Sequence, residues 1–171
     1  MGNSYGTARS FRGLTAVVFA LVLVTQGAAA QNCNPDRVVI TGDFGTAQFS
    51  VDVADDDASR AQGLMHVENM PLSRGMLFVY DTPQRMAFWM RNTLIELDML
   101  FVDGTGEIRH IHARAQPLDE TVISGGPEEL SAVLEINGGL AARLGIDVGD
   151  RLQHPAFADG ADGQGCAKIA E

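Results

Sequence analysis

Short apolar runs separated by turn-forming residues follow one another from residue 37 to residue 152. Residues 47–53 alternate apolar and polar side chains with a period of two, which predicts a strand. The core face of this strand carries Ala47, Phe49, Val51 and Val53. The β-branched run 37–41 stops at a turn and predicts the strand that pairs with it. Further strands are predicted at residues 76–80, 85–90, 95–102, 107–113, 121–123 and 132–136, with a last one near Leu152.

Two short helices are predicted among these strands. Acids at residues 55–57 can cap the exposed N–H groups of a helix over residues 58–65, and residues 140–144 predict a helical turn or two that ends at Gly145. Pro83 is expected to break the chain after the strand at residues 76–80. Because the strands are consecutive and joined by tight turns, the sequence predicts an α+β fold. We expect a β-rich, mostly antiparallel sheet curling toward a small barrel, with two short helices.

Residues 107–113 contain two histidines on one predicted strand. Strict alternation places His110 and His112 on the face of Ile108, opposite Arg109 and Ile111. Such a pair chelates a divalent metal only if a third ligand comes from a neighbouring strand, and two solvent-facing histidines give the same pattern. The second interpretation is preferred, so no metal site and no cofactor are predicted.

The first thirty residues have the pattern of a secretory signal peptide. Arg9 and Arg12 precede the apolar run 14–24, and three alanines at residues 28–30 offer a cleavage site before Gln31. The apolar run is shorter than the roughly 20 residues that a spanning helix needs, which disfavours an uncleaved anchor. We therefore expect a periplasmic or secreted protein without a membrane span after cleavage near Ala30. Residues 31–171 are predicted to form a single globular domain, with a flexible tail over residues 157–171.

The two cysteines lie near the two ends of the predicted mature chain. Export would place Cys33 and Cys166 in a compartment where disulfides persist, so a structural disulfide between them is predicted. The alternative is two unpaired thiols on flexible ends.

The 171-residue chain carries a net charge of −10. Removal of residues 1–30 takes away two arginines and no acid, which lowers the charge to −12. A strongly acidic protein is a poor match for nucleic acids and anionic membranes, so neither is expected as a partner.

The most suggestive candidate site surrounds the only Trp of the chain. Trp89, Arg91 and Asn92 follow one another closely, and Asp98 interrupts an apolar run. An aromatic face beside charged and amide groups is typical of sites for small polar ligands such as sugars. Asp98 has an alternative structural role, in which it is buried to pair with an arginine and to cap loop amides. The turn at Ser124, Gly125 and Gly126 can offer backbone N–H groups to the same ligand.

Three functional hypotheses follow. The favoured one is a non-catalytic binding or accessory module of the cell envelope, whose partner is a small polar ligand or an envelope component. The second is an envelope glycan hydrolase that uses Asp98 and Glu135 as paired carboxylates. The third is a periplasmic copper-binding protein, because six methionines fall between Met65 and Met99 beside Trp89 and thioethers are ligands for Cu(I). Methionine is also an ordinary filler of apolar cores.

Six ordered blocks of sequence resemble a known family. They are RAQGLM at 60–65, GMLF at 75–78, FWMRNTLIELD at 88–98, SGGP at 124–127, VLE at 133–135 and GIDVGD at 145–150. Together they are similar to the bacterial and archaeal family called domain of unknown function 192, over residues 38–152. The resemblance implies a compact α+β domain, often exported, with no established activity. Glu96 stands where this family often has Pro, and the two histidines match none of its motifs.

Overall fold

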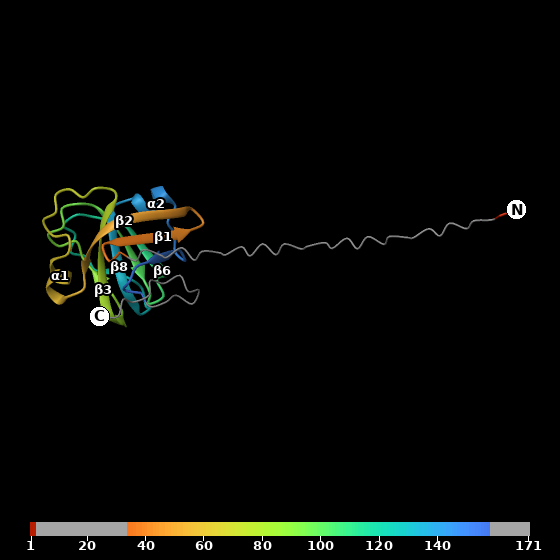
Figure 1. Ribbon diagram of the computed structural model, residues 1–171. Helices are drawn as coiled ribbons and strands as arrows, with labels where there is room; N and C mark the ends of the chain where they lie inside the picture. The colour runs from red at the N-terminus through yellow and green to blue at the C-terminus, as the bar shows by residue number, and fades with distance from the viewer. Residues whose placement is uncertain (3–33, 158–171) are drawn as a thin grey trace. The chain divides into compact units, whose positions relative to one another are not determined.

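The computed structural model describes residues 1–2 and 34–157 of the chain (Figure 1). Residues 34–157 fold into a strand-rich α+β domain with two short helices, as the sequence predicts. The elements, in chain order, are β1 (Arg37–Gly42), β2 (Gly45–Ala54), α1 (Asp57–Gln62), β3 (Arg74–Gln84), β4 (Ala87–Phe88), β5 (Leu97–Val102), β6 (Ile108–Ala115), β7 (Ile123–Ser124), β8 (Leu130–Asn137), α2 (Leu140–Leu144) and β9 (Arg151–Gln153).

Seven strands form one sheet in the order β6-β5-β8-β3-β2-β1-β9, while β4 and β7 pair separately. All pairings are antiparallel except the one between β2 and β3. Parallel neighbours need a crossover connection, and α1 with the loop that follows it provides the connection here. The predicted mostly antiparallel sheet is confirmed.

The sheet curls so that its two outermost strands meet at one end. Glu107, next to β6, forms a bridge with Arg151 of β9. The N–H of Ile108 donates to the carbonyl of Asp150 at 2.9 Å, and the N–H of Leu152 donates to the carbonyl of Gly106 at 2.7 Å. These backbone hydrogen bonds join the two edges at one end, so the sheet forms a curled half-barrel.

The barrel wall separates two apolar clusters. The inner cluster takes side chains from all seven strands, including Phe49 and Val51, and Ala47 and Val53 pack against it. The alternation predicted for residues 47–53 is therefore confirmed. The outer cluster lies on the other face of β3, β5 and β8 and includes Phe78, Met86, Met90, Met99, Phe101 and Val133. The segments before and after the two short strands β4 and β7 cover this outer cluster. The candidate site lies among these segments.

Strand β3 is longer than predicted, and Pro83 does not end it. The strand continues to Gln84, and the predicted strand at residues 85–90 is reduced to Ala87–Phe88. The register between β3 and β8 shifts between Val79 and Gln84. Pro83 is tolerated because it lies in this irregular stretch, where its missing N–H removes no regular ladder bond.

The prediction that His110 shares a face with Ile108 is wrong. Phe101 pairs with His110 and Val102 pairs with Ile108, so β6 contains one extra residue at this point. Such a bulge reverses the side-chain alternation beyond it. Ile108 is therefore in the inner cluster, whereas the His110 ring contacts the Phe101 ring of the outer cluster at a centroid distance of 5.7 Å.

The start of α1 is fixed by a capping box. The Asp56 carboxylate accepts hydrogen bonds from the N–H groups of Ala58 and Ser59, and the Ser59 hydroxyl oxygen accepts one from the N–H of Asp56. These bonds lower the pKa of Asp56 below its ordinary value. The predicted capping role of the acids is confirmed, and it fixes the beginning of the segment that later lines the pocket.

Gly75 permits the close approach of β3 and β8 at the centre of the sheet. A Cβ at this position would lie 2.5 Å from the backbone oxygen of Glu135. We expect Gly75→Ala to lower the free energy of unfolding by about 1–3 kcal/mol, because a central strand must shift to relieve the overlap. Gly104→Ala is the control, since its nearest neighbour would be the flexible Ser131 hydroxyl at 3.2 Å. Equal urea midpoints for the two variants would contradict this assignment.

Several predictions concern residues outside the described part of the chain. Cys33 and Cys166 both lie there, and so does the predicted signal segment apart from residues 1–2. Of the helices in the described residues, none has the length and apolar character needed to cross a membrane.

Candidate functional site

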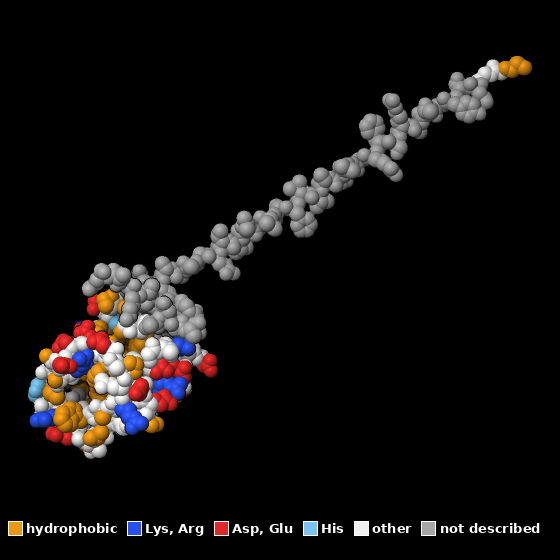
Figure 2. Space-filling view, turned by 90° about the horizontal axis from the view of Figure 1, so that it is seen from below, with side chains coloured by type: hydrophobic (Ala, Val, Ile, Leu, Met, Phe, Trp, Pro, Cys, Tyr) orange, Lys and Arg blue, Asp and Glu red, His pale blue; other side chains and the backbone are white. Residues whose placement is uncertain are grey.

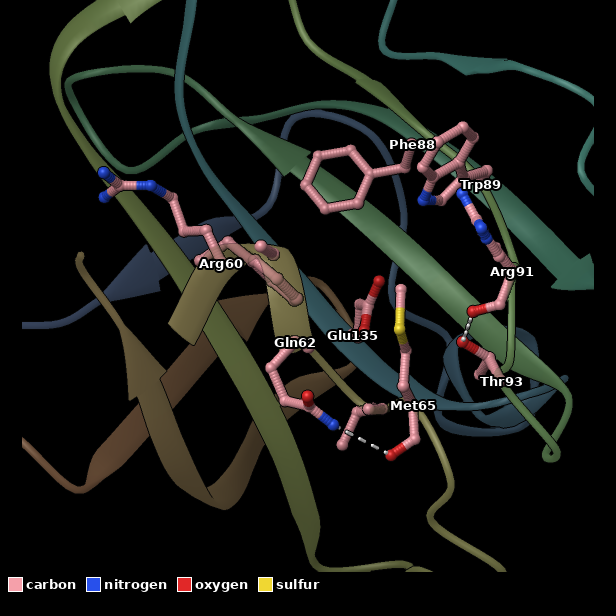
Figure 3. A pocket seen from close by; sticks show the side chains of 12 residues that line it. Arg60, Gln62, Met65, Phe88, Trp89, Arg91, Thr93 and Glu135 are labelled. Carbon is pink, nitrogen blue, oxygen red and sulfur yellow. Dashed lines mark hydrogen bonds between the residues drawn. The ribbon is translucent and has the colours of Figure 1, made fainter. Parts of the chain in front are cut away.

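A small pocket of about 50 Å³ opens on the outer face of the sheet (Figure 3). One wall is formed by residues 60–65, from α1 and the turn after it, and the opposite wall by Phe88, Trp89, Arg91 and Thr93. The sheet supplies Phe78 from β3 and Glu135 from β8. The pocket therefore combines three aromatic rings and a thioether with two arginines, other polar groups and one acid.

Glu135 reaches the pocket because β8 lies between β3 and β5. Its cross-strand neighbours are Met76 and Met99, which belong to the outer apolar face. The residue is only 4% exposed, and its carboxyl makes no hydrogen bond or ion pair with any described residue. Burial alone raises the pKa of Glu135 from 4.5 to about 8, so the acid is mostly protonated at neutral pH.

Arg60 lies on one side of the pocket with its charge already engaged. Its guanidinium donates to the carbonyls of Asp55 and Val79 at 2.6 and 2.8 Å, and to the Asp57 carboxylate at 2.8 Å. It also lies over the ring of Tyr80, 4.9 Å from the centroid. Figure 3 shows this guanidinium pointing away from Glu135. Arg60 therefore braces α1 against β3 and does not neutralise the buried acid.

Trp89 and Arg91 form the rim of the pocket. The Arg91 guanidinium lies 5.6 Å from the centroid of the Trp89 ring, and no described acid pairs with it. Trp89 is 48% exposed, an unusually high value for so large an apolar side chain. A second and larger depression, of about 290 Å³, is lined by Arg60, Tyr80, Ala87, Phe88, Trp89 and Val122. Trp89 and Phe88 thus separate two adjoining depressions.

Asp98 does not lie in this pocket. It is fully buried, and its carboxylate accepts three backbone hydrogen bonds, from Arg114, Gly139 and Ala141, at 2.8, 2.8 and 2.9 Å. These contacts tie β5 to the end of β6 and to the start of α2. The structural role considered for Asp98 is the one the geometry supports, with backbone amides as its partners.

The paired-carboxylate arrangement proposed for a hydrolase is wrong. Asp98 pairs with Ile136 across the β5–β8 ladder, and Glu135 pairs with Met99. Because successive side chains point to opposite faces, Asp98 faces the inner side of the sheet and Glu135 the outer side. Two carboxylates on opposite faces cannot flank one glycosidic bond.

Asn92 supports the pocket from outside. It adopts a positive φ of 55°, its carbonyl accepts from the N–H of His66 at 2.9 Å, and its amide contacts the sulfur of Met65 at 3.8 Å. Asn is among the residues that adopt this conformation readily. Asn92 therefore positions Met65 without lining the pocket itself.

The turn at Ser124, Gly125 and Gly126 is also separate from the pocket lining. The Ser124 hydroxyl accepts from the N–H of Gly126 at 3.1 Å, and the N–H of Gly125 donates to the carbonyl of Met86 at 3.0 Å. A side chain on Gly125 would overlap the rings and methyls of Phe101 and Leu130. These contacts explain the glycine by packing.

The methionines are mostly core residues. Met65 lines the pocket, whereas Met86, Met90 and Met99 are buried in the outer cluster. Within the described ranges no group of three or more His, Cys, Asp and Glu side chains is placed to hold a metal ion.

Sequence reasoning found Trp89 and Arg91 but missed the wall at Arg60 and Met65 and the role of Phe88. Glu135 had a detectable signal, since it is the only charged residue in the apolar run 132–136. A lone charge in an apolar run does not show which face of the strand carries it, so the sequence alone does not place Glu135 in a pocket.

Comparisons with known proteins agree with this fold. The model of the DUF192 family, described as "Uncharacterized ACR", matches residues 38–154. A crystal structure of a protein of unknown function from Novosphingobium aromaticivorans is 43% identical with a TM-score of 0.66, covering 68% of this chain and 82% of that one. A protein from Sinorhizobium meliloti, described as a proposed transcription regulator, is 39% identical with a TM-score of 0.68, covering 71% and 94%. No match was found among curated proteins. The chain therefore belongs to the DUF192 family.

Proposed function

We propose that this protein is an exported, non-catalytic binding module that holds a small organic ligand in the pocket beneath Trp89. The observation that carries the proposal is the buried carboxyl of Glu135, which faces the pocket and has no partner among the described residues. Small-molecule sites are concave and mostly apolar, with a few polar groups that orient the ligand. Phe78, Phe88 and Trp89 give this pocket an aromatic part, and Glu135, Arg91 and Thr93 are polar groups that can orient a ligand.

The cost of keeping Glu135 supports a role in binding. A buried acid without a hydrogen-bond partner destabilises the folded protein, and an apolar residue in the same strand would avoid that cost. Groups of this kind are concentrated at functional sites. A ligand that bonds to the carboxyl would supply the missing partner.

The export part of the proposal rests on the signal-like pattern of residues 1–30. The regulator description of the Sinorhizobium protein is not carried over as a role in DNA binding, because the net charge here is −10. On the face shown in Figure 2, basic side chains lie next to acidic ones and do not gather into a basic patch. A small ligand is the partner that the described surface supports best.

Trp89→Ala tests the proposed site. The purified protein is screened by native mass spectrometry against a library of small neutral, anionic and cationic molecules, and hits are titrated by calorimetry. We expect the substitution to weaken binding of a hit about tenfold, because one aromatic wall is removed. Thermal stability should change little, since the ring is already half exposed. Val148→Ala is the control, because Val148 is 59% exposed and does not line the pocket. A library without hits, or equal affinities for the two variants, would overturn the proposal.

A further inference from the structure

We propose that the ligand carries an ammonium group and that Glu135 is its counter-ion inside the pocket. This inference rests on the proposed function, since it names the class of molecule that the pocket receives. The proposed ligand is an organic cation, and not a neutral sugar or an anion.

The first argument is that the protein supplies no counter-charge for Glu135. The Arg60 guanidinium is bonded to Asp57 and to two carbonyls and points away from the acid. Arg91 lies at the rim against Trp89. From the sheet, the neighbouring strands place Met76 and Met99 beside Glu135, and neither is charged. A positive group that completes an ion pair must therefore come from the ligand.

The second argument is the character of the walls. Phe78 and Phe88 meet edge to face with their centroids 5.1 Å apart, and Trp89 extends the aromatic surface to the rim. Aromatic faces carry negative potential and attract cations, particularly alkylated ammonium groups whose surface is itself apolar. The polarisable sulfur of Met65 completes the lining. The faces of these rings repel an anion, and Arg91 at the rim is the one group of the lining with a charge left to attract it.

The charge on Glu135 makes binding depend on pH with a definite sign. The titratable and charged groups around it are Tyr80 from β3, which interacts with it, and two arginines of the pocket lining, Arg60 pointing away from it and Arg91 at the rim. Burial raises the pKa of Tyr80 above its ordinary value, and the hydrogen bond to Asp57 raises the pKa of Arg60, so neither group titrates near neutrality. Glu135 itself is protonated below about pH 8. Because a cation binds the ionised form, its affinity rises as the pH rises toward 8, and binding releases a proton.

The experiment uses two permanently or fully charged probes and their neutral isosteres. Choline is compared with 3,3-dimethylbutan-1-ol, in which carbon replaces the nitrogen, and methylammonium with methanol. Calorimetric titrations of the full protein are run at pH 6, 7 and 8. We expect the better cation to bind at least tenfold more tightly than its isostere. Its affinity should rise roughly 50-fold between pH 6 and pH 8, as follows from a pKa of about 8.

Glu135→Gln provides the second arm, since glutamine keeps the size of the side chain and removes its charge. At pH 8 we expect this variant to bind the cation about 10- to 100-fold more weakly than the parent, and its affinity should not depend on pH. Glu129→Gln, at an exposed position away from the pocket, should bind like the parent.

The outcomes separate this inference from the proposed function. Cations that bind no better than their isosteres, or an affinity that falls as the pH rises, would overturn the ammonium proposal. If neutral or anionic library members then bind in a Trp89-dependent manner, the binding module stands and its ligand class is different. If no molecule of any class binds, both proposals are overturned.

Discussion

Glu135→Gln is expected to stabilise the ligand-free protein at pH 8 by up to about 5 kcal/mol. The carboxyl has a pKa of 4.5 when exposed and about 8 when folded. For each pH unit between these two pKa values, the free energy of unfolding changes by about 1.4 kcal/mol, because the folded and unfolded states differ by one bound proton. Removing the charge therefore removes one of the largest single unfavourable contributions to the fold.

The sign follows from proton binding. Between pH 4.5 and 8 the folded protein holds a proton on Glu135 that the unfolded chain has lost, so raising the pH favours unfolding. The parent protein should lose stability steadily over this range, and Glu135→Gln should not. The stabilisation by the substitution is thus small near pH 4.5 and largest at and above pH 8.

Urea unfolding at a series of pH values, followed by the fluorescence of Trp89, measures this effect. The difference between parent and variant isolates Glu135 from the other carboxyls, which titrate in both. Glu129→Gln, exposed at the surface, should track the parent at every pH. A constant difference across the range would show that the Glu135 carboxyl is not desolvated as the structure indicates.

Asp98→Ala is expected to destabilise the protein by about 3–5 kcal/mol. The substitution leaves three buried N–H groups without an acceptor, and each such loss costs about 1–3 kcal/mol before the structure relaxes. Asp98→Asn should cost less, about 1–3 kcal/mol. One oxygen of the parent accepts from Arg114 and Gly139 and can be kept by the amide carbonyl, while Ala141 is left facing an N–H₂ group.

The graded loss distinguishes this explanation from a general effect of removing an acid. Asp81→Ala is the matched control, because Asp81 is an exposed acid of β3 whose carboxylate makes no hydrogen bond or ion pair with any described residue. Equal urea midpoints for Asp98→Ala and Asp81→Ala would contradict the role of Asp98. At temperatures where Asp98→Asn is folded, its ligand binding should match the parent, since Asp98 does not line the pocket.

The sequence predicted those strands whose alternation is regular. Residues 47–53 show a clean period of two, and their burial follows it. The sequence failed where the backbone adds or skips a residue. The bulge in β6 moves His110 to the other face, and the shifted register of β3 admits Pro83. Neither irregularity is encoded in the polarity of the residues concerned, because it depends on how two distant strands align.

The candidate site was only half predictable for a related reason. Trp89 and Arg91 attract attention as an aromatic next to a charge, but the pocket also needs residues from α1 and β8. Glu135 and Asp98 look alike in sequence, since each is a lone acid in an apolar run. Only the strand pairing shows that one is bonded to three amides on the inner face and the other faces a pocket on the outer face.

The short strand β9 also protects the domain from self-association. It covers Val39, Ile40 and Thr41 of β1, and the residues that precede it bond to the start of β6. A chain truncated before Arg151 would expose β1, with unpaired N–H and C=O groups along residues 39–41. Exposed edges of this kind recruit strands from neighbouring molecules. Three residues near the end of the described domain thus keep β1 from acting as a template for intermolecular β-sheet growth.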